Sequence, residues 1–177
     1  MLGQYARVRT ILDRAEEIDN EEPLGAAERS KPFQPATVAE IAAFEAKLGY
    51  ALPPSYREFL RLHNGWQCFW GDSWIAGVSG KARAFVQSRA RAARTWVGSE
   101  SGWDPKRDLV IGADDNGGFL VLAREAGRGG ERAILDCVAG VVIPQNTFSS
   151  FADLVAKQLR YRSKDVQRLP KPQRILR

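Results

Sequence analysis

Few residues in this chain could act as a nucleophile or a general base. His63 is the single histidine, so any catalytic pair that needs an imidazole must use it. Cys68 follows five positions later, which leaves a Cys-His pair open, but packing or capping is the simpler interpretation of His63. Ser79 lacks the G-x-S-x-G context of a nucleophile elbow. The sequence therefore predicts no catalytic site.

Metal and phosphate motifs are also missing from the sequence. One histidine together with Cys68 and Cys137, which are 69 positions apart, does not form a zinc-ligand pattern. The run Asp114 to Gly118 resembles a calcium loop only loosely, because it lacks alternating ligands and a distal glutamate, and it predicts a tight hairpin turn instead. The glycines from Gly127 to Gly130 have no following Lys-Ser/Thr, as a phosphate-binding loop would. We expect no metal and no cofactor.

The side chains best suited to binding are tryptophans. Three of the five tryptophans fall within nine positions around a Gly-Asp turn, and a fourth lies in the loop from 98 to 105. They could pack the sheet against helices, but tryptophan is also the residue type most enriched at interface hot spots. If both loops lie at one edge of the sheet, they form a partner-binding surface made of Trp66, Trp70, Asp72, Trp74, Trp103 and Asp104.

Two short amphipathic helices should precede this aromatic cluster, within residues 37–66. Thr37 and Glu40 have the spacing of a capping box at the first helix start. The Pro-Pro pair at 53–54 suits the start of the second helix, because proline lacks only an N–H group that the first turn would leave unpaired. Asn64 and Gly65 then end that helix.

This stretch also carries a family resemblance. The order Ile-x-x-Phe-Glu-x-x-Leu-Gly from residue 41, Leu-Pro-x-x-Tyr-x-x-Phe-Leu from residue 52, and then Asn-Gly resembles the signature of the SUKH superfamily. That superfamily includes a fungal regulator of cell-wall synthesis and many bacterial immunity proteins of polymorphic toxin systems. The resemblance extends over about residues 37–159, and it implies a protein that binds other proteins.

The rest of the chain completes an α+β pattern. Apolar spacing predicts a helix at 4–19, and Pro and Gly mark 20–36 as a linker. Strands are expected near 66–78, 109–122 and 133–143, with a helix after Ser79 and a closing helix capped by Ser150 and Asp153. We predict a single SUKH-like domain with a mainly antiparallel sheet and helices packed on one side. The expected boundaries are 1–36 for the N-terminal helix and linker, 37–160 for the domain and 161–177 for a basic tail.

The net charge of +5 is concentrated at the C-terminal end. Residues 160–177 hold seven Lys/Arg and one acid, whereas the other 159 residues hold 19 basic and 20 acidic side chains. This distribution argues against nucleic-acid binding as the main function, and Arg83, Arg91 and Arg94 on one predicted helix, with the basic tail, keep it open as an alternative.

The resemblance to the SUKH superfamily implies an immunity protein, and the absence of a catalytic set and the many aromatic residues support this interpretation. The sequence has no apolar run long enough to span a membrane and no secretory signal, so we expect a cytoplasmic protein with reduced cysteines. It would bind and neutralise a toxin that acts in the cytoplasm, such as a nuclease, deaminase, ADP-ribosyltransferase or nucleotide-consuming enzyme, by blocking its active site or substrate access. A regulatory protein-interaction scaffold is the other alternative.

Overall fold

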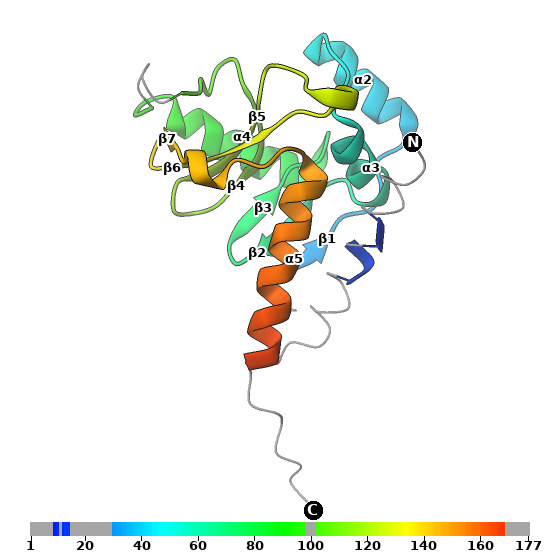
Figure 1. Cartoon of the computed structure of the whole chain (residues 1–177). Coiled ribbons are helices and arrows are strands. Elements are labelled where there is room, and N and C mark those ends of the chain that lie inside the picture. Colours follow the sequence, from blue (N-terminus) through cyan, green and yellow to red (C-terminus); the bar gives the residue numbers. More distant parts are fainter. Residues whose placement is uncertain (1–8, 11, 15–29, 98–101, 169–177) are drawn as a thin grey trace, which may run out of the picture.

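The computed structural model describes residues 9–10, 12–14, 30–97 and 102–168, with residues 162–168 described by their backbone alone. Within these residues, seven strands form one antiparallel sheet in which each strand pairs with the next one along the chain. The strands are β1 (Lys31–Pro32), β2 (Trp66–Trp70), β3 (Ser73–Ile75), β4 (Leu109–Ala113), β5 (Gly118–Leu122), β6 (Ile134–Val138) and β7 (Val141–Val142). Short 3₁₀ turns occupy Arg128–Gly130 and Pro144–Asn146. The single antiparallel α+β domain is confirmed (Figure 1).

The two helices of the resemblance are α2 (Val38–Leu48) and α3 (Pro54–Leu62). At the start of α2 the Thr37 hydroxyl accepts a hydrogen bond from the Glu40 N–H, and the Glu40 carboxylate accepts one from the Thr37 N–H at 2.8 Å. Gly49 ends α2 with a φ of +77°, a left-handed conformation that glycine adopts at low cost. Local sequence therefore determines where α2 begins and ends.

The start of α3 is stabilised by a residue far away in the sequence. Pro53 precedes this helix and provides no side-chain hydrogen bond. The buried carboxylate of Glu131 instead accepts hydrogen bonds from the Ser55 N–H at 2.9 Å and from the Ser55 hydroxyl at 2.6 Å. Glu131 belongs to the connection between β5 and β6, which therefore closes onto α3.

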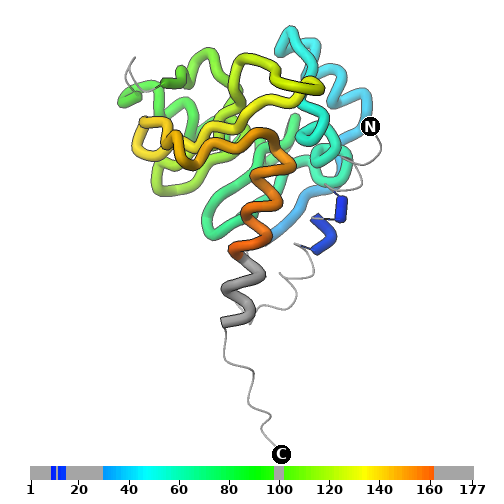
Figure 2. The backbone as a smooth tube through the Cα atoms, viewed as in Figure 1, coloured from blue at the N-terminus to red at the C-terminus, as the bar shows by residue number. Residues whose placement is uncertain are grey.

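Helices cover both faces of the sheet, which differs from the expected one-sided packing. Helices α2, α3 and α5 (Phe151–Arg168) share a core with one set of strand residues, such as Ile111. Helix α4 (Gly80–Ala93) packs against the opposite set, which includes Val110 and Val121. Because side chains alternate along a strand, β4 and β5 supply apolar residues to both cores. Figures 1 and 2 show α5 in orange on one side of the strands and α4 in green on the other.

The segments outside the predicted domain differ in part from expectation. Residues 9–10 and 12–14 are helical, and Leu12 is fully buried in the α2–α3–α5 core. The rest of the predicted 4–19 helix, residues 20–29 of the linker, residues 98–101 of the loop and residues 169–177 of the tail lie outside the described residues. Strand β1 lies in what was expected to be linker, and it pairs with β2. Helix α5 continues to residue 168, past the expected domain boundary at 160.

Candidate partner-binding site

Three of the four tryptophans expected at the binding surface are buried. Trp66 is fully buried and contacts Phe69 edge to face, with ring centroids 5.3 Å apart. Trp74 stacks on Phe85 of α4 with its centroid 4.4 Å away. Trp103 is 5% exposed and packs against Phe119. These three indoles therefore pack in the core, and the prediction that they lie on an exposed surface is contradicted.

Trp70 and Asp72 are exposed, at the turn between β2 and β3. Trp70 is 44% exposed, and its indole stacks on the ring of Tyr161 in α5, with centroids 5.9 Å apart and planes 11° from parallel. Asp104 is half-buried beside Trp103, and these two residues border a different pocket from Trp70. The two loops thus border different pockets.

A bulge in β2 decides which aromatic residues are buried. Trp66 pairs with Ile75 and Trp70 pairs with Ser73, so β2 has two more residues than β3 between these pairs. Cys68 takes a φ of +49° within the bulge, which breaks the simple alternation of side chains. As a result, Trp66 and Phe69 both enter the same core, and Trp70 reaches the end of the strand beside α5.

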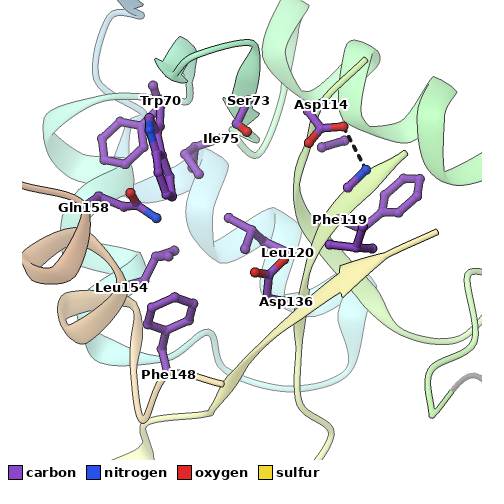
Figure 3. A pocket seen from close by; sticks show the side chains of 14 residues that line it. Trp70, Ser73, Ile75, Asp114, Phe119, Leu120, Asp136, Phe148, Leu154 and Gln158 are labelled. Carbon is purple, nitrogen blue, oxygen red and sulfur yellow. Dashed lines mark hydrogen bonds between the residues drawn. The ribbon is translucent and has the colours of Figure 1, made fainter. Parts of the chain in front are cut away.

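Trp70 forms one wall of a pocket of about 290 Å³ between the sheet and α5. Figure 3 shows the side chains that line it, with Trp70 and Gln158 on one side and Asp114 and Phe119 on the other. Its apolar walls include Phe148 and Leu154. Aromatic walls with a few polar groups are typical of a site that takes up one side chain or small group of a partner.

The polar groups of this pocket are mainly hydrogen-bond acceptors. Gln158 is 6% exposed, and its buried Oε1 atom has no hydrogen-bond partner in the part of the chain that the structure describes. Burial raises the pKa of Asp136; a hydrogen bond from Asn146 lowers it, and the nearby Asp114 carboxylate raises it further. Asp114 uses one carboxylate oxygen to accept the N–H groups of Asn116 and Gly118 in the β4–β5 turn. The pocket therefore favours a partner group that donates hydrogen bonds or carries positive charge.

The comparison with known families agrees with this fold. The sequence model of the SMI1/KNR4 family (SUKH-1) matches residues 35–157, more than half of the chain. The chain belongs to the SUKH-1 family. No curated protein matches the sequence of this SUKH-1 protein. The matched range contains most of the residues that line the Trp70 pocket, but Gln158 and Tyr161 lie beyond its end.

The residues considered for catalysis have other roles in this SUKH-1 protein. His63 packs between Phe59 and Trp66, and burial lowers its pKa. Cys137 is fully buried, which raises its pKa to about 12, and Cys68 and Cys137 are not joined by a disulfide. Among the residues that the structure describes, no group of three or more His, Cys, Asp or Glu could hold a metal ion. None of the described helices is both long and apolar enough to cross a membrane.

Proposed function

We propose that this SUKH-1 protein is an immunity protein that binds and neutralises a cognate toxin in the cytoplasm. Family membership is consistent with this role. The observation that carries the proposal is the exposed Trp70, already stacked on Tyr161, beside a pocket in which the buried Oε1 atom of Gln158 has no hydrogen-bond partner among the described residues. A nuclease, deaminase, ADP-ribosyltransferase or nucleotide-consuming enzyme would be inhibited when this surface covers its active site or substrate entrance.

The pair of Trp70 and Tyr161 is suited to act as the anchor. Both rings are nearly half exposed, at 44% and 45%, and each holds the other in place by stacking. A partner that covers them gains apolar burial at a small cost in side-chain entropy, because the rings are already ordered. Asp72 at the nearby turn then adds a charge at the rim, where its effect falls mainly on the association rate.

The test combines rescue of growth with measured affinity. Cells that express the toxin domain encoded by a neighbouring reading frame should grow when this protein is co-expressed. Trp70→Ala should weaken toxin binding about 30-fold, which corresponds to a hot-spot loss of about 2 kcal/mol. Val38→Ala is the control, because Val38 is also exposed, at 66%, but lies at the start of α2 and does not line the Trp70 pocket.

Two results would argue against the proposal. Equal affinity of wild type and Trp70→Ala for the toxin would remove the Trp70 pocket from the interface. Recovery of several unrelated cellular proteins in a pull-down, with no rescue from any neighbouring toxin, would favour the regulatory scaffold instead.

A further inference from the structure

A second pocket, of about 320 Å³, is lined by an unusual concentration of basic side chains. It lies between the C-terminal end of α2, one side of α4 and the segment that leads into β4. Six basic residues line it, namely Lys47, Arg83, Arg91, Arg94, Lys106 and Arg107. It shares no lining residue with the Trp70 pocket. The three arginines that kept nucleic-acid binding open are thus gathered around one cavity.

The single acidic residue in the lining does not neutralise these cations. The Asp108 carboxylate accepts hydrogen bonds from Arg124 Nε and from the Asp104 N–H, and its side chain is only 6% exposed. Within the described residues, none of the six basic side chains forms an ion pair. Among the described residues that line it, the pocket therefore holds six basic side chains against one carboxylate, which already pairs with Arg124.

Arg83 carries the argument, because its guanidinium is mostly buried. Its Nη1 atom donates to the Val110 carbonyl at 3.1 Å, and its Cζ atom lies 4.9 Å from the centre of the Phe44 ring. Its Nε atom is buried, and no described residue accepts a hydrogen bond from it. Burial lowers the pKa of Arg83, and the groups that oppose this effect are the hydroxyls of Tyr56 and Tyr50, not carboxylates. A buried charge of this kind is costly unless a counter-ion accompanies it.

Helix ends explain only part of the arrangement. Lys47 is in the last turn of α2 and Arg91 is in the last turn of α4, where the helix dipole favours positive charge. Arg83 is the fourth residue of α4, near the helix N-terminus, where the dipole disfavours positive charge. Lys106 and Arg107 come from a loop. Helix capping therefore does not account for the convergence of all six cations.

We propose that this pocket binds a small molecule that carries phosphate groups. Arginine forks match phosphate oxygens in a bidentate manner, and a phosphate would supply negative charge among the six basic side chains that line the pocket. The volume of about 320 Å³ suits a ligand with one or two phosphoryl groups and a small organic part. A long nucleic acid is disfavoured, because residues 1–159 as a whole carry a net charge of only −1.

The probe is sodium pyrophosphate, titrated into the full chain and followed by isothermal calorimetry at low and at physiological salt. Arg83→Met keeps most of the apolar stem and should weaken binding at least tenfold, because it removes charge-assisted hydrogen bonds. Arg91→Gln and Arg94→Gln change exposed side chains that cannot endanger the fold, and each should weaken binding about threefold or more. The matched control is Arg89→Gln, because Arg89 lies on the same helix but pairs with Asp115 outside the pocket. It should bind pyrophosphate as the wild type does.

Three results would overturn the proposal. The first is no binding of pyrophosphate or inorganic phosphate at low salt. The second is equal weakening by Arg89→Gln and Arg91→Gln, which would indicate a diffuse attraction to surface charge. The third is tighter binding of a single-stranded RNA oligonucleotide than of pyrophosphate, with the steep salt dependence of many phosphate contacts, which would assign the surface to nucleic acid.

Discussion

The contact between Glu131 and Ser55 gives the sharpest prediction about stability. The Glu131 side chain accepts two short hydrogen bonds, at 2.9 and 2.6 Å, and Glu131 is 7% exposed. Each hydrogen bond to a charged group contributes about 1.5 to 3 kcal/mol, and a negative charge at a helix start adds to this. Part of the stability lost on mutation is recovered when water enters the space left by the Glu131 side chain and binds the Ser55 N–H group. We therefore expect Glu131→Ala to lower the free energy of unfolding by about 3 kcal/mol, and Glu131→Gln by about half of that.

Urea denaturation followed by far-ultraviolet circular dichroism measures this loss. The matched control is Glu125→Ala in the same β5–β6 connection, where the side chain is exposed and the expected change is within about 0.5 kcal/mol. Ser55→Ala combined with Glu131→Ala should cost less than the sum of the two single changes, because each removes the same contact. A Glu131→Ala protein as stable as the control would refute the reasoning.

Three further predictions concern the core and its ionisable groups. Gly77→Ala should lower the free energy of unfolding by about 3 kcal/mol, because the added methyl carbon would lie 2.2 Å from the Asn64 carbonyl oxygen. Gly49→Ala should lower it by about 1 kcal/mol, because the site has open space but a positive φ. Equal losses in urea denaturation would contradict this prediction. Burial raises the pKa of Asp136, so the contribution of this carboxyl group to the free energy of unfolding is complete below its pKa in the unfolded state and is lost as pH rises through its pKa in the folded state. Asp136→Asn should therefore resist urea better than the wild type at neutral pH, and this gain should shrink in acid. A gain that does not change with pH would contradict this prediction. Cys137 should react with an aromatic disulfide reagent only after unfolding, because it is buried and its pKa is raised to about 12. Cys68 is half-buried and should react first. Two thiols that react rapidly in the native protein would contradict this prediction.

Much of the local structure could be predicted from the sequence, because its causes lie within four residues. The Thr37 and Glu40 side chains form the expected capping box, and the Asp153 N–H donates to Ser150 at the start of α5. Asp114 organises the β4–β5 turn through its hydrogen bonds to Asn116 and Gly118. In each case a short polar side chain satisfies a backbone group nearby, and this requirement does not depend on the rest of the fold.

The arrangement of the candidate site depends on contacts over longer distances. The bulge at Cys68 places Trp66 in the core and leaves Trp70 exposed, although both residues are tryptophans of the same strand. No periodicity reveals such a bulge, because the extra residues are seen only against the partner strand. Likewise, 76 positions separate Ser55 from Glu131. The basic residues of α4 could be predicted from the sequence, but only the structure shows that they lie around one pocket with Lys106 and Arg107.

The family signature explains why recognition should lie elsewhere on the molecule. Tyr56 donates to the Ala76 carbonyl at 2.7 Å, and Asn64 accepts the Val78 N–H and donates to the Ser79 hydroxyl. These signature residues thus tie α3 to the segment between β3 and α4, and they are occupied in doing so. Trp70 and Tyr161 instead stack on each other and are nearly half exposed, and Tyr161 lies beyond the range that the family model matches. If the proposed interface is correct, we expect substitutions at Trp70 and Tyr161 to change partner binding without weakening the hydrogen bonds of Tyr56 and Asn64.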